Sequence, residues 1–530
     1  MAAIVLATIN AKWIHPSLAL RLLKANLDGG PGSSLADEGA AGCIIDCTIL
    51  ELALRQSLKE KTAALLEASP AILGFSVSIW NHQATEELLG ALEAAWETRH
   101  ETGQARRPPP VIVLGGPELT FLPRDTPLFD HADFVLRGEG EEVFPRLCRA
   151  ILEDRDRAKK TWGRFIDAPA ADLAELKSPY GLYTEEDLGQ KLIYVESSRG
   201  CPYTCAFCQS AVKPAAGNSP PVREFPLEPF LAGLEELLDR IVRREQTGKA
   251  PPPRTIKFLD RSFNLRLPRA LSILEFCLAK TEAARRTGVS LEFHFELVPS
   301  LFSPELGAAL ARFPPGSLRL EAGVQSLNPR TRGLIQRVSS PEGELETLRF
   351  LRTRTAAAVH ADLIAGLPGE DLASFGEGFD RLWIALGAED SAAEIPANDD
   401  SAAGHTAPRE IQPGILKCLP GTPIRDMADR GAFTVEYRRT APYEVIATES
   451  LSRADMDRIK NFARLWELIV NRRAFPDLLP RIAPPGKPVF WSFMELSRRL
   501  FDLFGRNWGI PKDQLREAAE GFINQPTLDT

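Results

Sequence analysis

The sequence predicts an α/β protein made of a doubly wound parallel sheet, a partial (β/α)6 barrel and a helical C-terminal part. Two observations carry this prediction. Short apolar runs alternate with stretches of helical periodicity in two successive series along the 530 residues. Continuous β-branched runs separated by helices are typical of parallel strands that are buried on both faces. The last part of the chain has helical periodicity alone, and we therefore divide the chain into residues 1–150, 151–190, 191–430 and 431–530.

Five apolar runs within residues 1–150 predict the strands of the first sheet: 4–8, 44–50, 71–79, 111–114 and 134–136. Helical stretches such as 17–27 and 83–99 lie between them. In open parallel sheets, ligands bind beyond the carboxyl ends of the strands. Small and polar residues gather at those ends, and six of them are candidate ligand contacts: Asn10, Ser76, Trp80, Gly115, Gly116 and Gly138.

Residues 151–190 read as a charged connector with little periodicity, and a second series of strands follows it. The expected strands are 192–196, 255–259, 291–297, 318–324, 359–364 and 415–419, with helices such as 227–242, 268–284 and 341–352 between them. Six strands in this order predict a partial barrel with its chemistry at the carboxyl ends. Residues 387–408 are rich in Ala, Asp, Glu and Ser, which is typical of a disordered insertion. Helices are expected at 450–472 and 493–504.

The composition narrows the class of protein. Hydrophobic residues make up 44% of the chain and charged residues 25%, as in soluble globular proteins. A net charge of −8 argues against a nucleic acid or an anionic membrane as the partner. The N-terminus lacks the pattern of a signal peptide, and no apolar run is long enough to span a membrane. Eight cysteines in this length do not suggest a disulfide framework, so we expect a reducing, cytoplasmic location.

The most informative feature is a group of three cysteines, Cys201, Cys205 and Cys208, spaced C-x3-C-x2-C. The nearest other cysteines along the chain are Cys148 and Cys277. Structural zinc needs four protein ligands, so three thiols are the wrong number for it. A cubane iron–sulfur cluster held by three thiolates keeps one iron without a protein ligand. The spacing therefore favours a cluster with an open iron.

The run from Glu196 to Cys208, ESSRGCPYTCAFC, resembles the cluster motif of the radical S-adenosylmethionine (radical SAM) superfamily. The resemblance implies a [4Fe-4S] cluster whose open iron binds SAM and that cleaves SAM reductively to a 5′-deoxyadenosyl radical. Phe207 matches the position that packs on adenine, although ordinary hydrophobic packing would also explain it. Asp260 and Glu321 end two later strands at positions implied to contact SAM; a solvated or capping carboxylate is the alternative for each.

The first domain resembles the cobalamin-binding domain that precedes many radical SAM barrels, on segments 10–15, 75–81, 115–118 and 137–141. The six strand-end residues would then contact cobalamin. A histidine ligand to cobalt usually lies in a D-x-H-x-x-G pattern, which Asp130-His131-Ala132 does not satisfy. We therefore expect cobalamin with its dimethylbenzimidazole tail detached and no histidine on cobalt. A flavodoxin-like domain without a ligand is the alternative.

The segment from residue 438 to 471 resembles a helical domain found in one subgroup of cobalamin-binding radical SAM proteins of unassigned substrate. The resemblance as a whole implies methyl transfer to an unactivated centre of a small molecule, with flavodoxin or ferredoxin as electron donor. Two alternatives stay open: a cobalamin-assisted cyclisation or rearrangement, and a non-catalytic protein that carries a cluster for regulation.

Overall fold

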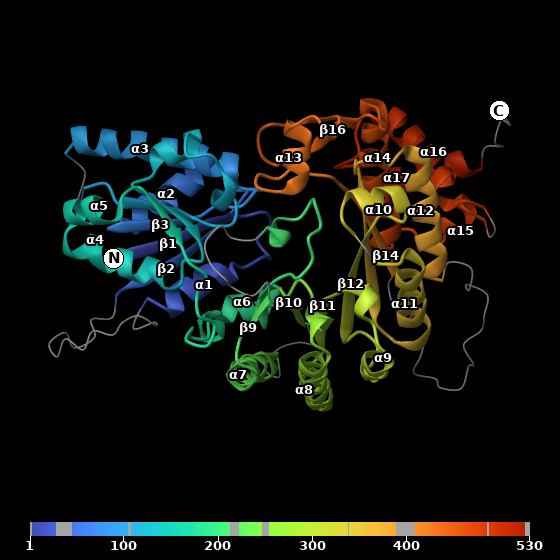
Figure 1. The fold of residues 1–530 in the computed structure, drawn as a ribbon, viewed down its shortest axis with the longest axis horizontal. Helices are drawn as coiled ribbons and strands as arrows, with labels where there is room; N and C mark the ends of the chain where they lie inside the picture. The colour runs from blue at the N-terminus through green and yellow to red at the C-terminus, as the bar shows by residue number, and fades with distance from the viewer. Residues whose placement is uncertain are drawn as a thin grey trace. The chain divides into compact units, whose positions relative to one another are not determined.

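The computed structural model describes residues 3–27, 45–103, 108–212, 222–245, 254–337, 339–387, 409–484 and 487–524 (Figure 1). The chain divides into two compact units. The first unit comprises Met1–Gly200, Lys213–Leu259 and Thr287–Val289, and the second comprises Cys201–Val212, Asp260–Arg286 and Ser290–Thr530. The four-part division expected from the sequence stays a prediction. Within the described ranges, no helix is long and apolar enough to cross a membrane.

The first unit contains a six-stranded parallel sheet in the order β2-β1-β3-β4-β5-β6. The strands are β1 (Ile4–Asn10), β2 (Cys47–Ala53), β3 (Ile72–Ser76), β4 (Val111–Gly115), β5 (Phe134–Gly138) and β6 (Phe165–Ala168). The order turns between β1 and β3, which makes the sheet doubly wound with its switch point there. The predicted fold class of this part is confirmed.

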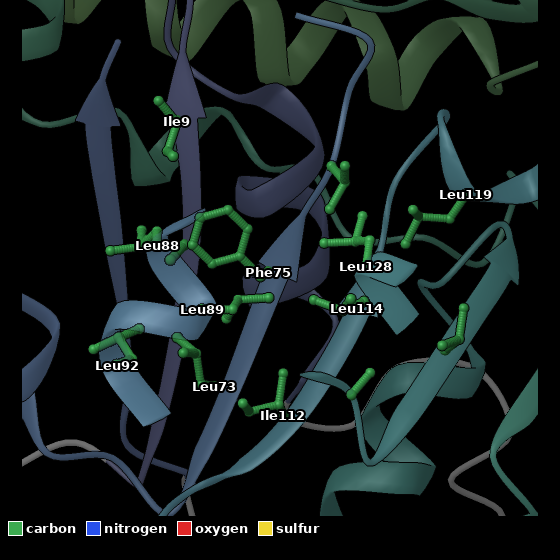
Figure 2. Close-up of a cluster of buried hydrophobic side chains, with 14 of the residues drawn as sticks. Ile9, Leu73, Phe75, Leu88, Leu89, Leu92, Ile112, Leu114, Leu119 and Leu128 are labelled. Carbon is green, nitrogen blue, oxygen red and sulfur yellow. The ribbon is translucent and has the colours of Figure 1, made fainter. Parts of the chain in front are cut away.

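Helices cover both faces of this sheet, which is why its strands read as continuous apolar runs. On one face lie α2 (Leu58–Ala68) and α3 (His82–Glu101). Leu88, Leu89 and Leu92 of α3 belong to the same buried hydrophobic cluster as Phe75 of β3 (Figure 2). On the other face lie α1 (Leu18–Ala25) and α4 (Val143–Glu153). Their contacts with the sheet include Leu20, Phe144 and Leu147.

Two expectations about strands were wrong. Residues 155–168, expected within an irregular connector, form α5 (Arg155–Trp162) and the edge strand β6, which contributes one buried side chain, Ile166. Such a short strand shows almost no periodicity in the sequence. The last strand of the second series, β14, is Arg409–Ile415 instead of 415–419. It pairs with one neighbour through a segment that contains Pro413, and an edge strand tolerates a proline that the apolar pattern does not reveal.

The second series of strands and helices alternates as predicted. In the first unit it consists of α6 (Glu185–Gln190), β7 (Ile193–Val195), α7 (Leu227–Glu245) and β10 (Arg254–Phe258), with β7 and β10 parallel, and the small antiparallel pair β8 (Ser198–Gly200) and β9 (Val222–Glu224). In the second unit it consists of α8 (Leu267–Arg286), β11 (Leu291–Leu297), α9 (Pro304–Ala311), β12 (Leu318–Gln325), α10 (Pro329–Leu334), α11 (Pro341–Arg354), β13 (Ala358–Ala365), α12 (Leu372–Ala385) and β14. Strands β11 to β14 pair in parallel in chain order. The six-strand series of a partial barrel is thus confirmed, whereas residues 388–408 of the expected insertion lie outside the described residues.

The C-terminal part is mainly helical, as expected. It contains α13 (Pro423–Asp429), α14 (Arg453–Trp466) with a π-helical end (Glu467–Asn471), α15 (Leu479–Ile482), α16 (Val489–Phe504) and α17 (Lys512–Ile523), and also a hairpin of β15 (Val435–Tyr437) and β16 (Val445–Thr448). Aromatic rings join α12, α14 and α16: Phe379 and Trp466 have centroids 4.9 Å apart, and Phe462 and Phe490 also 4.9 Å. This cluster ties the C-terminal helices to a helix of the second strand series.

A buried ring of four charges holds α6 against the first sheet. Arg21 on α1 contacts Glu51 at 3.1 Å and Asp187 at 2.7 Å, and Lys191 contacts the same two carboxylates at 3.2 and 2.9 Å. All four side chains are buried, with at most 9% exposure. Burial alone would raise the pKa of Asp187, but hydrogen bonds from Thr184 and the two cations outweigh burial and lower it to about 2.

We expect Asp187→Asn to lower the free energy of unfolding of the first unit by about 3–5 kcal/mol at pH 7, because two buried cations, Arg21 and Lys191, would then share the single carboxylate of Glu51. Since the pKa of Asp187 is lowered in the folded state, its stabilising effect is complete above its unfolded pKa of about 3.9. The effect is lost as the pH falls towards the folded value of about 2. Urea unfolding followed by circular dichroism at pH 7 and at lower pH measures both effects. Glu228→Gln, a change of an exposed carboxylate on α7, is the control; equal midpoints for the two variants would contradict the prediction.

Candidate functional site

The three cysteines of the predicted cluster motif lie on one short loop of the second unit, between Gly200 and the 3-10 turn Gln209–Ala211. Cys201, Cys205 and Cys208 are free thiols and are partly exposed. The other described cysteines are all buried: Cys47, Cys148, Cys277 and Cys418. The structure therefore separates the three predicted ligands from the cysteines that fill the core.

Backbone hydrogen bonds fix the middle of this loop. The N–H of buried Ala206 donates to the carbonyl of Ile335 at 3.1 Å, and its own carbonyl accepts from the N–H of Ile424 at 2.9 Å. The Cys208 N–H donates to the Cys205 carbonyl at 3.1 Å, which closes a tight turn between two of the thiols. The loop is thus held by its backbone from both sides, and no cysteine side chain is needed to anchor it.

The thiols of the loop interact electrostatically with one another and with two arginines. Burial raises the pKa values of Cys201 and Cys205, and the charges of the neighbouring thiols raise them further. Arg261 opposes this shift at Cys201, and Arg337 opposes it at Cys205. Three thiolates on one loop would repel one another, and the irons of a cluster would remove that repulsion, so the donor set fits a cluster held by three thiolates. Among the described side chains, no three or more of His, Cys, Asp and Glu are arranged to hold a single metal ion.

The residues expected to contact SAM occupy different environments in the second unit. Asp260 lies two residues after the end of β10 and is buried. Glu321 lies on β12, where its Oε2 is 3.0 Å from Nε2 of His294 on β11. Phe207, in the cysteine loop, is partly buried. Contact of these three residues with SAM stays a prediction.

Sequence reasoning missed a row of polar residues on one face of β11 to β14. The strand register aligns Glu321 with His360, and His360 with Glu410, so these side chains share one face. His360 lies between Asp362 and Glu410, each at 3.0 Å, and Glu410 also contacts Arg319 at 2.9 Å. The strict alternation in LEFHFEL and AVHADLIA was the signal that could have found this face.

His360 is a cation at neutral pH. Burial alone would lower its pKa, but hydrogen bonds to Asp362 and Glu410 outweigh burial and raise the pKa to about 10. This face of the strands therefore carries charges of both signs, which suits a binding site for a polar ligand.

The first unit contains a cavity of about 320 Å³ between its sheet and helices α1 and α4. Its walls are apolar, with Leu6, Val113, Leu136 and Phe144 among them, and its rim is charged: Glu139, Glu141 and Arg199. Four of the six predicted cobalamin contacts line it: Ser76, Gly115, Gly116 and Gly138. The carboxyl ends of β3, β4 and β5 thus form its edge, as the sequence predicted for a ligand site.

The other two predicted contacts, Asn10 and Trp80, are not among the residues that line this cavity. Asn10 is buried, and its side-chain amide donates to Glu51 at 3.4 Å. The indole N–H of Trp80 donates to the Ile9 carbonyl at 3.2 Å, while half of the side chain is exposed. Both residues connect neighbouring segments at the strand ends, and their contact with cobalamin stays a prediction.

The three glycines at the cavity edge differ in whether the backbone leaves room for a side chain. Gly116 has φ +111, and a Cβ there would lie 2.4 Å from the Val77 carbonyl oxygen. A Cβ on Gly138, at φ +92, would lie 2.5 Å from the Ala168 carbonyl oxygen. Both positions therefore need glycine for the chain turn itself. At Gly115 the nearest atom to such a Cβ is 3.7 Å away, which is ordinary van der Waals contact, so a Cβ fits here without a clash.

Three histidines of the first domain, His15, His82 and His131, each have a side-chain partner. Nδ1 of His15 is 2.6 Å from the Tyr194 hydroxyl, and burial, Lys12 and Lys257 lower the His15 pKa. Nδ1 of His82 is 3.0 Å from Glu118, and Nδ1 of His131 is 2.9 Å from Glu93. None of the three lines the cavity.

Comparison with known proteins agrees with this arrangement. Residues 195–382 match the family model described as the radical SAM superfamily, so this part of the chain is similar to a radical SAM domain. A methyltransferase from Pyrococcus horikoshii described as uncharacterized is 25% identical over 284 residues, which cover 49% of this chain and 54% of the relative. The chain thus spans about half the length of this curated relative.

Two solved structures share the fold. The cobalamin-dependent S-adenosylmethionine radical enzyme OxsB, with aqua-cobalamin bound, is 15% identical at a TM-score of 0.59, covering 97% of this chain and 75% of that chain. The radical S-adenosylmethionine methyltransferase TsrM from Kitasatospora setae, with tryptophan and a SAM analog bound, is 17% identical at a TM-score of 0.54, covering 83% and 80%. At these identities the likeness shows a common fold.

Replacing Cys201, Cys205 or Cys208 by Ala should abolish cluster assembly. After anaerobic reconstitution, the parent protein is expected to hold about four irons and four sulfides per chain, as a cubane cluster requires. Iron and sulfide analysis measures the effect. Ala replacements of the buried cysteines Cys47, Cys148, Cys277 and Cys418 serve as controls and should retain the iron. Stoichiometric zinc in place of iron, or full iron content after loss of Cys205, would contradict the assignment.

Asp260→Ala and Glu321→Ala should each weaken SAM binding while the iron content stays the same. Loss of a hydrogen bond to a charged group costs about 1.5–3 kcal/mol, or roughly ten- to over a hundredfold in affinity. Titration calorimetry with SAM on the reconstituted protein measures this. Glu346→Ala, which removes an exposed carboxylate on α11, is the control. Parent-like SAM affinity in both variants would show that these carboxylates are not SAM contacts.

Proposed function

We propose that this protein is a cobalamin-dependent radical SAM methyltransferase that acts on an unactivated centre of a small-molecule substrate. The observation that supports the proposal is the combination of two sites in one chain. A loop with three accessible thiols lies in the part of the chain that is similar to a radical SAM domain, and an apolar cavity with a charged rim lies at the strand ends of a doubly wound domain. Relatives named as methyltransferases agree with this reading.

Cys201, Cys205 and Cys208 would hold a [4Fe-4S] cluster that, with SAM bound, supplies a 5′-deoxyadenosyl radical. The backbone of Ala206 would keep the loop in place during this chemistry, because both of its hydrogen bonds are independent of the thiols. The polar face around Glu321 and His360 would bind and orient a polar substrate through its fixed charges. Reduction of the cluster calls for a one-electron donor such as flavodoxin or ferredoxin, and thiolate ligands call for a reducing, cytoplasmic environment.

The cavity of the first unit would hold part of cobalamin, which supplies a carrier for the methyl group. A narrow space of about 320 Å³ with leucine and phenylalanine walls suits a flat aromatic group such as the detached dimethylbenzimidazole base. We infer that His15, His82 and His131 would not reach cobalt, since none of them lines the cavity and each has a hydrogen-bond partner within the unit.

Gly115→Leu should exclude cobalamin by filling the cavity while the chain still folds, because a Cβ at this position meets no atom closer than 3.7 Å. We expect hydroxocobalamin affinity to fall at least tenfold, or by about 1.4 kcal/mol, with unchanged iron content. Absorbance titration measures the affinity. Gly181→Leu, at an exposed position of the first unit with open space around it, is the control; cobalamin affinity that is equal in the two variants would place the cofactor elsewhere.

The bound cobalamin should have a base-off absorption spectrum, and His15→Ala and His82→Ala should leave that spectrum unchanged.

The catalytic test uses reconstituted protein with SAM, cobalamin and a low-potential reductant, and measures two products of SAM. Methyl transfer requires S-adenosylhomocysteine together with 5′-deoxyadenosine. Formation of 5′-deoxyadenosine without S-adenosylhomocysteine would indicate a cyclisation or rearrangement enzyme. If the protein binds SAM but forms neither compound, it is a non-catalytic cluster protein.

A further inference from the structure

The loop of the three thiols, residues 201–208, packs against segment 331–337, and both belong to the second unit. We call residues 201–208 the cluster loop. The N–H of Ala206 in this loop donates to the carbonyl of Ile335 at 3.1 Å, and both residues are buried. Arg337 follows Ile335 by two residues. The hydrogen bond therefore brings the backbone next to Arg337 against the middle of the cluster loop.

The side chain of Arg337 is held by a backbone carbonyl and a carboxylate. Its Nη2 donates to the carbonyl of Gly323 and lies 3.2 Å from Oε1 of Glu344 on α11. The register of β12 with β13 shifts between Gly323 and Gln325, as in a β-bulge, and bulges are common next to functional sites. Only 14% of the Arg337 side chain is exposed. The guanidinium thus has a fixed place between the irregular end of β12 and the cluster loop.

Glu344 is shared by two arginines. Its carboxylate is fully buried and binds Arg332 through two nitrogens at 3.0 and 3.1 Å, in addition to Arg337. Arg332 is itself only 2% exposed. Within the described part of the chain, the ion pairs of these three residues therefore combine two positive charges with one negative charge. An uncompensated charge in a buried place is costly, so this group of residues suits an anion beside Arg337.

Arg337 is within hydrogen-bonding reach of the thiol of Cys205. Burial raises the pKa of Cys205, whereas the charge of Arg337 and a hydrogen bond from its side chain lower it. The Nε–H of Arg337 is also buried, and no atom of the described residues accepts it. Buried donors normally have an acceptor. A sulfur atom of a cluster, either thiolate or sulfide, would supply that acceptor and the missing negative charge, so these residues fit a cluster on the loop.

We propose that Arg337 donates a hydrogen bond from its guanidinium to a sulfur atom of the cluster and thereby raises the reduction potential of the cluster. The inference rests on the proposed function for the presence of a [4Fe-4S] cluster on the three thiols. The step concerned is the uptake of one electron from a one-electron donor of the flavodoxin or ferredoxin class, and no covalent bond forms or breaks in it.

The direction of the effect follows from charge. One added electron makes the cluster and its thiolates more negative by one charge. A fixed cation with N–H groups directed at sulfur stabilises the more negative state, because net charge and hydrogen bonds to sulfur are among the factors that set the potential. Because Glu344 holds the guanidinium in place, Arg337 needs little rearrangement when the electron arrives. Loss of Arg337 should therefore make the cluster harder to reduce.

Redox titration of the reconstituted full-length protein, followed by the electron paramagnetic resonance signal of the reduced cluster, tests the inference without SAM or turnover. We expect Arg337→Gln to keep the parent's iron content. Its equilibrium constant for one-electron reduction should fall at least about tenfold, or by about 59 mV. Arg330→Gln, which removes an exposed arginine from α10, is the control and should keep the parent's potential. The parent's potential in Arg337→Gln at full iron content would overturn the inference.

A lysine variant separates the hydrogen bond from the charge. Arg337→Lys keeps the positive charge but lacks the planar guanidinium with its fixed N–H groups. Its reduction constant should lie at least about threefold below that of the parent. If Arg337→Gln does not retain iron, this comparison carries the test. The parent's potential in Arg337→Lys would show that charge alone is sufficient and would overturn the hydrogen bond to sulfur.

Titration calorimetry with SAM separates the inference from a role of Arg337 in SAM binding. Because the potential is measured without SAM, a contact between Arg337 and the SAM carboxylate cannot produce the expected shift. Weaker SAM binding together with the parent's potential in Arg337→Gln would assign the guanidinium to SAM and overturn the inference. A parent protein without an iron–sulfur cluster would overturn the proposed function as well, whereas a cluster whose potential does not respond to Arg337 would overturn the inference alone.

Discussion

Parallel pairing is the constraint on which the rest of this structure depends. Every pair within the first sheet is parallel, and so is every pair from β11 to β14. Two successive parallel strands are joined by a crossover connection, which brings the chain back to the end of the sheet where the previous strand began. Each strand then runs in the same direction. All carboxyl ends of one sheet then share an edge. Residues as far apart in sequence as Ser76, Gly115 and Gly138 meet around one cavity for this reason.

The parallel sheets do not by themselves fix the loops and helices around them. Buried arginines hold several of these segments in place. Arg21 joins α1 to β2 and α6, Arg199 joins the cavity rim to β8, and Arg332 in the second unit binds Glu344 through two nitrogens at 3.0 and 3.1 Å. Removing a guanidinium from water costs free energy of desolvation. Carboxylates that match the geometry of each guanidinium offset this cost. An arginine–carboxylate pair is stable only in a narrow range of geometries, so it selects one arrangement of the loops that it joins. Hydrophobic contacts depend less on geometry and select less strictly.

Cysteine illustrates how environment assigns roles to one residue type. Cys148 and Cys277 are fully buried, and burial raises the pKa of each thiol well above its ordinary value, which suits an inert core side chain. The loop cysteines are partly exposed and lie among one another and near Arg261 and Arg337, a setting in which metal binding relieves the repulsion between thiolates. His360 makes the same point among histidines, because two carboxylates make it a cation whereas burial and nearby lysines lower the pKa of His15.

The sequence by itself determined the features that depend on local order: the α/β series, the positions of most helices, and the three thiols, whose spacing is a property of one loop. It failed where the signal was weak, at the short edge strand β6 and at the proline-containing β14. Only the tertiary structure decided which strand-end residues reach the cavity, because Asn10 and Trp80 have the same local pattern as Ser76 but turn to other partners. It also decided that Arg199 binds Glu139 and Glu141 and that His360 lies between two acids, since these contacts join residues far apart in the chain and depend on how strands are placed, which no local pattern encodes.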